Sequence, residues 1–381
     1  MTLEEPEKVS RKISSMPPKQ REEYINIQAS KAEDFDASHV QEFTDANKLF
    51  YSDFHALLVG KTRQGKTTLL TTMLKRFLDK DKETTILHRD DGGLEFLYLA
   101  RYYPTRVFIP NDENIELIPV GFKCDIVRFD NPQEIIKKVW QYDYPFNVIV
   151  YDVYSLNAAT KAKFYSELFM RLLFHVQQMR KNAKKPVIFS IDELNDLVPP
   201  KGKGNPEMAL TRSDVEQNIR KLGKHKVRLI GSAHRFNQIG LDTRSQFEQV
   251  YIKKCYGYDA WDFFTKNLAT SNKSTFWKVL KHVLKMPRNE FLLFDENQQY
   301  DFYKFPDIPR PDPNKIDIEA IGSLPIKTKE DKKESMFRTR FLKATAELGK
   351  LGLSDAEICR RLEISPTNYN QIKNRNIQLT A

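Results

Sequence analysis

Short apolar runs alternate with longer stretches of helical periodicity between about residues 50 and 305, and polar residues dominate on both sides of this segment. The runs are apolar nearly throughout, as in parallel strands that are covered on both faces. The pattern predicts an α/β fold with a mainly parallel sheet flanked by helices. Strands are expected at residues 55–59, 84–88, 106–109, 125–129, 147–152, 187–192, 227–233 and 249–253, with a closing hairpin at 291–294 and 300–305.

The residues before and after this segment divide into three further parts. Residues 1–45 are rich in Glu, Lys, Ser and Gln and lack sustained periodicity, so they are interpreted as a flexible N-terminal arm with a short helix. Residues 306–333 combine repeated prolines with a lysine-rich end, which is the composition of a partly stiffened linker. Residues 334–381 show helical periodicity again. The predicted domains are therefore an arm, a core at 46–305, a linker and a small all-α C-terminal domain.

The composition supports folded domains and excludes several classes of protein. Hydrophobic residues make up 40% of the chain and charged residues 29%, which is enough apolar surface for a core. The 61 Lys and Arg against 51 Asp and Glu leave a net charge of +10, which indicates a polyanionic partner or Lys-rich solubility. The three cysteines are far apart, and no segment approaches the ~20 apolar residues of a membrane helix. We therefore expect a protein of a reducing cytoplasm, without a disulfide framework or membrane insertion.

A phosphate-binding loop follows the first predicted strand. Eight residues match G-x-x-x-x-G-K-[ST] in full, and Thr68 follows them. The matching residues are Gly60, Lys61, Thr62, Arg63, Gln64, Gly65, Lys66 and Thr67. An apolar strand enters the motif and an amphipathic helix leaves it, which is the context that the motif requires. Glycines let main-chain N–H groups turn towards phosphates, and the helix N-terminus adds partial positive charge. The motif predicts ATP binding, with Lys66 at the β- and γ-phosphates and the Thr67 hydroxyl on Mg²⁺.

Two strand ends offer an aspartate for the metal side of such a site. Residues 147–152 end in Asp152, whereas residues 187–193 end in Asp192 and Glu193. Hydrolysis needs one carboxylate for the metal and its water shell, and a second to polarise the attacking water. Because only the tandem pair offers both, we predict that Asp192 binds Mg²⁺ and that Glu193 is the base. Asp152 remains an alternative metal ligand.

Four blocks of the core resemble the HerA/FtsK group of DNA-translocating ATPases, and most of all its HerA-like and viral genome-packaging members. The blocks are the phosphate loop at 60–68, the strand at 148–156 with the long helix after it, the segment 186–199 around Asp192, and residues 220–235. A helix and strand like those of the group follow at 241–253. The resemblance covers roughly residues 50–305. The N-terminal β-barrel of the group has no counterpart before the core.

The resemblance implies a RecA-like P-loop ATPase that forms a hexameric ring and hydrolyses ATP at subunit interfaces to drive duplex DNA through the pore. His234 stands where the group has a glutamine that senses the γ-phosphate, so it takes the sensor position. An arginine from the neighbouring subunit would complete each site by stabilising charge on the phosphoryl group. The candidates for this arginine are Arg220, Arg235 and Arg244.

Two further segments of the core offer contacts to DNA. The loop 199–205 is rich in Gly and Lys, and Lys201 and Lys203 are predicted to contact phosphates without selecting a sequence. A solvated loop without a special role has the same composition. Residues 261–285 interleave aromatic residues with lysines, which suits a stacking platform for single strands. Their helical spacing favours a core helix with one wet face instead.

Two short helices are predicted in the C-terminal domain. Ser354 and Glu357 form a capping box at the first, and Ser365 with Pro366 begins the second. The pair resembles a helix-turn-helix, whose second helix enters the major groove. The second helix carries donors suited to base edges and phosphates, namely Asn368, Asn370, Gln371, Lys373 and Arg375. A three-helix protein-docking module is the alternative.

The motifs together predict an ATP-hydrolysing motor that translocates or packages duplex DNA for a virus or mobile element, with a DNA-reading tail. Such a motor would act in the host cytoplasm or with the virion, and a capsid or a nuclease would be a fitting partner. The main alternative is an AAA-type initiator or transcription regulator, in which ATP controls oligomerisation and the tail binds a DNA site. A nucleotide-gated scaffold is a third interpretation.

Overall fold

The chain separates into two units, Met1–Glu319 and Ala320–Ala381. The computed structural model describes residues 3–43, 54–80, 82–90, 93–111, 117–119, 124–152, 158–179, 185–268, 272–297, 299–305 and 318–320, together with residues 354, 355 and 357. The predicted recognition helix, which contains Asn368 to Arg375, lies outside the described residues, as does most of the predicted linker. The helix-turn-helix therefore stays a prediction.

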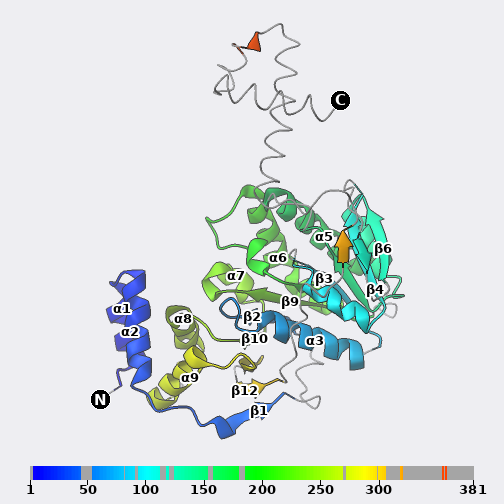
Figure 1. Cartoon of the computed structure of the whole chain (residues 1–381). Coiled ribbons are helices and arrows are strands. Elements are labelled where there is room, and N and C mark those ends of the chain that lie inside the picture. The colour runs from blue at the N-terminus through cyan, green and yellow to red at the C-terminus, as the bar shows by residue number, and fades with distance from the viewer. Residues whose placement is uncertain are drawn as a thin grey trace. The chain divides into compact units, whose positions relative to one another are not determined.

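An 11-stranded sheet forms the centre of the first unit (Figure 1). Its strand order is β1-β12-β11-β10-β2-β9-β8-β3-β7-β4-β6. Neighbours from β10 to β6 are all parallel, as are β1 and β12, whereas β11 runs antiparallel to both β10 and β12. The sheet strands are β1 Val40–Glu42, β2 Ala56–Val59, β3 Thr85–Arg89, β4 Thr105–Pro110, β6 Cys124–Phe129, β7 Phe146–Ile149, β8 Val187–Ile191, β9 Val227–Ala233, β10 Gln249–Ile252, β11 Glu290–Phe294 and β12 Tyr300–Lys304. Two short strands, β5 Leu117–Pro119 and β13 Ile318–Ala320, lie outside it.

Helices connect the parallel strands. The described α-helices are α1 Pro6–Ser14, α2 Pro18–Ser30, α3 Lys66–Lys80, α4 Pro132–Val139, α5 Ala158–Gln178, α6 Pro206–Lys224, α7 Leu241–Arg244, α8 Gly257–Asn267 and α9 Lys273–Lys285. Short 3-10 turns add η1 Ala37–His39, η3 Glu95–Arg101, η5 Leu194–Asp196 and η6 Phe236–Gln238. Among the described helices, none combines the length and the apolar character needed to cross a membrane.

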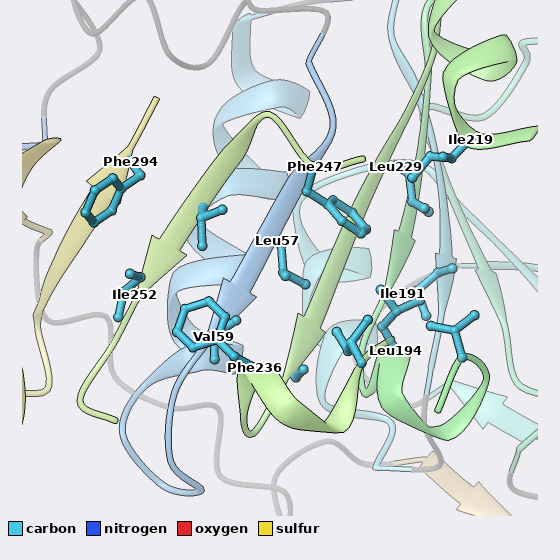
Figure 2. Packing of buried hydrophobic residues seen from close by; sticks show 14 of the residues in the cluster. Leu57, Val59, Ile191, Leu194, Ile219, Leu229, Phe236, Phe247, Ile252 and Phe294 are labelled. Carbon is cyan, nitrogen blue, oxygen red and sulfur yellow. The ribbon is translucent and has the colours of Figure 1, made fainter. Parts of the chain in front are cut away.

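The sheet buries a separate hydrophobic cluster on each face, and β2 contributes to both. Ala56 and Leu58 belong to the cluster that includes α3, while Leu57 and Val59 belong to the larger cluster on the opposite face. Figure 2 shows Leu57 and Val59 beside Phe236 in this larger cluster. Because side chains alternate between the faces of a strand, a strand that is covered twice must be apolar at every position. The uninterrupted run in the sequence is explained by this double burial.

The mixed α/β fold with a large, mostly parallel sheet is confirmed. The expected strand at residues 227–233 coincides with β9, and the closing hairpin is the antiparallel pair β11 and β12. The expected strand at residues 147–152 is shorter, because β7 ends at Ile149 and Asp152 lies beyond it. Residues 40–42 were not expected to form a strand, yet β1 pairs in parallel with β12 at the edge of the sheet.

The N-terminal segment is packed against the core, which makes the expectation of a flexible arm wrong for residues 3–43. Val9 and Ile13 of α1 and Ile25 of α2 are buried in the larger cluster. Figure 1 shows α1 and α2 beside α8, and α2 contacts both α8 and α9. A few apolar residues at helical spacing suffice for this packing, although the average composition of the segment is polar.

Polar contacts complete the attachment of this segment. The Glu22 carboxylate accepts hydrogen bonds from the N–H groups of Gly257 (2.6 Å) and Tyr258 (2.8 Å), and so caps the N-terminus of α8. The Trp277 indole of α9 donates to the carbonyl of Glu4 at 2.8 Å. Charged residues that suggested solvation in the sequence are therefore used as helix caps and ion pairs.

The packing of α2 can be tested with two isoleucines on the same helix. Ile25 is fully buried, whereas Ile27 is 49% exposed. We expect Ile25→Ala to lower the free energy of unfolding by about 2–5 kcal/mol, because it removes buried atoms and leaves a cavity. Ile27→Ala should change it by at most about 0.5 kcal/mol. Urea unfolding of both variants checks this, and equal stabilities would contradict the packed arrangement.

Candidate nucleotide site

The predicted phosphate loop joins β2 to α3 and is anchored by the strands on both sides. The Gly60 N–H donates to the carbonyl of Ala233 at the end of β9 (3.2 Å), and the Lys61 N–H donates to the carbonyl of Lys254 after β10 (2.8 Å). Lys66, Thr67 and Thr68 form the first turn of α3. The N-terminus of this helix leaves main-chain N–H groups that are suited to bind an anion.

Both motif glycines are required by close contacts. A Cβ atom at Gly60 would lie 2.5 Å from the Cβ of Lys253. Gly65 has a φ of +84°, and a Cβ atom there would lie 2.7 Å from the carbonyl oxygen of Arg288. A side chain at either position would displace the loop, and at Gly65 it would also strain the backbone. Arg63, between them, is a non-glycine residue with a positive φ of 62°.

Parallel strand ends bring the predicted catalytic groups together. The Lys66 Nζ lies 2.8 Å from His234 Nδ1, and His234 Nε2 lies 3.1 Å from Glu193 Oε1. A lysine ammonium only donates, so Nδ1 is assigned as the acceptor, and Nε2 then carries the proton that is donated to Glu193. His234 therefore connects the loop lysine to the second residue of the acidic pair.

The aspartate of the pair is held in place by its neighbours. Asp192 is 5% exposed, and its Oδ1 accepts hydrogen bonds from the Ser232 hydroxyl and from the Glu193 N–H, the latter at 3.2 Å. Glu193 itself has a left-handed backbone with a φ of 51°. Carboxylate and hydroxyl oxygens are the ligands that Mg²⁺ prefers. The donor types of Asp192 and Thr67 therefore fit the metal that was predicted from the sequence.

A buried arginine that was not predicted from the sequence supports the main chain of the acidic pair. Arg89, at the end of β3, is 0% exposed. Its Nη1 donates to the carbonyls of Asp192 (2.9 Å) and Glu193 (3.1 Å). The signal in the sequence was a charged residue directly after the predicted strand at residues 84–88. The contact holds the segment in which Glu193 takes its left-handed conformation.

Asp152 is the partner of this arginine. The Arg89 guanidinium contacts both carboxylate oxygens, at 2.5 Å and 3.2 Å, and Lys161 lies 3.0 Å from Oδ1 while Tyr165 donates to Oδ2 at 2.5 Å. Burial alone would raise the pKa of Asp152, but the charge of Arg89 and the other contacts lower it. Asp152 is therefore an ionised partner of Arg89, which argues against the alternative role as a metal ligand.

The three candidate arginines lie in different surroundings. Arg220 is exposed on α6. The Arg235 guanidinium stacks 3.7 Å from the centroid of the Tyr256 ring, whose centroid also lies 4.2 Å from Lys61 Nζ. Arg244 is partly buried, and burial lowers its pKa. It lines a cavity of about 420 Å³, together with Phe236 and other residues.

Both lysines of the predicted DNA loop, Lys201 and Lys203, have exposed side chains. Lys201 also forms an ion pair with Asp242, in which its Nζ lies 2.6 Å from Oδ2.

Four aromatic residues of the segment 261–285 are core residues of α8 and α9, whereas Phe263 is partly buried. Trp261, Phe264, Phe276 and Trp277 are buried in the larger cluster, as the helical spacing favoured. Buried rings cannot stack on bases, so these four side chains do not form a platform for single strands.

The comparisons with known proteins give structural likenesses only. No protein-family model matches the chain, and no curated protein matches its sequence. The genome packaging NTPase B204 from Sulfolobus turreted icosahedral virus 2, in complex with AMPPCP, is 15% identical with a TM-score of 0.42, and the match covers 67% of this chain and 98% of that chain. VirB4 of Thermoanaerobacter pseudethanolicus is 10% identical with a TM-score of 0.44, with 67% and 90% covered.

The pCW3 conjugation coupling protein TcpA, in its monomer form with ATPgS, is 14% identical with a TM-score of 0.36, and the match covers 75% of this chain and 73% of that chain. This chain is similar to these three solved structures at 10–15% sequence identity.

The buried pair of Arg89 and Asp152 can be tested by removing one charge and then both. We expect Arg89→Met to lower the free energy of unfolding by about 3–5 kcal/mol, because it leaves a buried carboxylate without its main partner. Adding Asp152→Leu should recover part of this loss. Denaturant unfolding of the single and double variants gives the coupling, and strictly additive effects would contradict the proposed pair.

Proposed function

We propose that this protein is an ATP hydrolase that uses Mg²⁺-ATP to move duplex DNA. The observation that carries the proposal is the connection from Lys66 through His234 to Glu193, at 2.8 Å and 3.1 Å. It places the lysine of a phosphate loop and a carboxylate suited to activate water on either side of one imidazole. Cleavage of a terminal phosphate requires a cation on the phosphates and a group that orients the attacking water, and the site offers a residue for each.

Each residue of the site has a role that follows from its chemistry. The main-chain N–H groups of residues 60–68 and the Lys66 ammonium bind the phosphates, and the N-terminus of α3 adds partial positive charge. The Thr67 hydroxyl and the Asp192 carboxylate hold Mg²⁺, which neutralises charge on the phosphates when it is bound. Glu193 orients the attacking water and accepts its proton.

His234 takes the sensor role in this proposal. Its Nε2–H holds one carboxylate oxygen of Glu193, while Nδ1 faces the ammonium of Lys66. When Lys66 binds phosphate oxygens, its contact with the imidazole changes, and the position of Glu193 changes with it. The state of the terminal phosphate is thereby transmitted to the base.

Duplex DNA is the proposed substrate, and a ring of subunits is the proposed assembly. The net charge of +10 and the sequence blocks that resemble DNA-translocating ATPases support this substrate. Lys203 and, after release from Asp242, Lys201 are proposed to contact phosphates. Arg220 is exposed and is the proposed trans arginine of a hexamer. Residues 306–333 and 334–381 are proposed as a linker and a DNA-reading tail in a packaging or transfer motor.

The base can be tested separately from nucleotide binding. We expect Glu193→Gln to bind ATP with the affinity of the wild type but to lose turnover by about 100-fold or more, because the metal and phosphate ligands remain while the base is lost. Steady-state phosphate release and equilibrium binding of labelled ATP measure the two properties. Glu167→Gln, a change on α5, is the matched control and should keep wild-type turnover. Undiminished turnover in Glu193→Gln would remove this residue from the mechanism.

The motor can be distinguished from the initiator by the response to DNA. We expect the ATPase rate to rise with the length of random-sequence duplex, because a translocating ring hydrolyses ATP for as long as it travels. Rates measured with duplexes of increasing length at constant total base pairs test this. Stimulation by a single site alone would favour the initiator, and no stimulation by any duplex would favour the scaffold.

A further inference from the structure

A lysine is buried directly behind the phosphate loop. Lys253 follows β10 and is 0% exposed. Its N–H donates to the carbonyl of Val59 at 2.7 Å, so its backbone is fixed to the end of the strand that enters the loop. A buried lysine is rare and needs partners for its charge. The role of this residue is not explained by the motif, which ends before it.

The side chain of Lys253 runs beneath both glycines of the motif. Its Cβ would lie 2.5 Å from a Cβ at Gly60, and its Cε would lie 3.7 Å from a Cβ at Gly65. The stem therefore fills the space that the two missing side chains leave open. Any change in the conformation of this stem acts on the loop directly.

The amine of Lys253 holds a second segment against the loop. Nζ donates to the carbonyls of Arg288, at 2.6 Å, and of Glu290, and it lies 4.6 Å from the centroid of the Phe305 ring. The Arg288 carbonyl is the same group that would lie 2.7 Å from a Cβ atom at Gly65. The turn between α9 and β11 is thus fixed by the lysine and in turn supports Gly65.

We propose that Lys253 is a positioning residue of the nucleotide site, whose buried amine fixes the α9–β11 turn under the phosphate loop and whose charge favours the bound phosphates. The inference rests on the proposed function, because it requires that the loop binds a nucleotide. It also makes nucleotide binding depend on whether the amine carries a proton. The Lys253 amine donates to the carbonyls of Arg288 and Glu290, which are neutral acceptors. A polyanion bound on the other side of the loop therefore strongly favours the protonated amine.

The charges around Lys253 determine the direction of the pH effect. Burial lowers the pKa of Lys253 to about 7; Glu290 acts to raise it and Arg288 to lower it. The Glu290 carboxylate is itself paired with His282 at 2.9 Å. On the loop side, the cations of residues 61 and 66 add positive charge. A bound polyphosphate outweighs these cations and raises the pKa of Lys253, so binding takes up a proton.

The affinity for nucleotide should therefore fall as the pH rises. Below pH 7 the amine is charged before and after binding, and its contribution to nucleotide affinity is complete. As the pH rises from about 7 through the higher pKa of the bound state, the free protein loses the proton first and the affinity falls. Each unit by which binding raises the pKa corresponds to about a tenfold change in affinity. A neutral amine still has two N–H donors, so the contacts to both carbonyls persist.

The test compares Lys253→Met with Lys254→Met in the full-length protein. Mg²⁺-ADP is the probe, because it lacks the γ-phosphate that would lie beside His234 and is not hydrolysed. We expect Lys253→Met to weaken binding about tenfold at a pH of about 6.5, with a smaller difference at about 8.5. Lys254→Met removes the same formal charge from the adjacent, partly exposed side chain but keeps the main-chain carbonyl that accepts from Lys61, so it should leave the affinity and its pH profile unchanged.

The outcomes separate this inference from the proposed function. If the wild type does not bind Mg²⁺-ADP, the proposed function fails. If it binds, but Lys253→Met matches Lys254→Met or its effect is independent of pH, only the role of Lys253 is overturned. Should Lys253→Met not fold, calorimetry of the wild type at a pH of about 7.5, in two buffers of different ionisation enthalpy, replaces it. Net proton uptake on binding Mg²⁺-ADP supports the inference, and zero uptake or proton release overturns it.

Discussion

Three adjacent parallel strands determine where the candidate nucleotide site lies. β2, β9 and β8 are neighbours in the sheet and point the same way, so their carboxyl ends meet at one edge. Lys66 and His234 are 168 residues apart in the sequence, yet they approach to 2.8 Å. A slip of one residue in any of the three strands would exchange its side chains between the two buried faces and also separate these groups. The same hydrophobic pattern that stabilises the sheet therefore holds the site together.

Two buried cations lie behind this edge, and their environments differ in a way that follows from their chemistry. Arg89 stays charged at all accessible pH values, and it is paired with the ionised Asp152. Lys253 has main-chain carbonyls and a ring as partners, so its charge is only partly compensated. The arginine gives the acidic segment a fixed support, whereas the lysine gives the phosphate loop a support whose charge depends on the proton and on the ligand.

The sheet and the motif residues could be predicted from the sequence because both depend on local patterns. Apolar runs mark strands that are covered on both faces, and a strand, a glycine-rich loop and a helix in succession mark the phosphate loop. The partners of Asp152 and the position of Lys253 depend on strands that are distant in sequence, so composition and spacing could not reveal them. The packing of α1 and α2 was missed for a related reason, because Val9, Ile13 and Ile25 are a minority in a polar segment whose burial requires α8 and α9.

A neutral histidine at position 234 offers the same pair of hydrogen-bonding functions as the glutamine that the sequence resemblance led us to expect there. A glutamine amide accepts through its oxygen and donates through its nitrogen, and a neutral imidazole accepts at one nitrogen and donates at the other. In this chain Nδ1 accepts from Lys66 and Nε2 donates to Glu193. A doubly protonated imidazole would have no acceptor for the lysine and would repel it. The contact with Lys66 therefore requires a neutral ring, a requirement that a glutamine would not have.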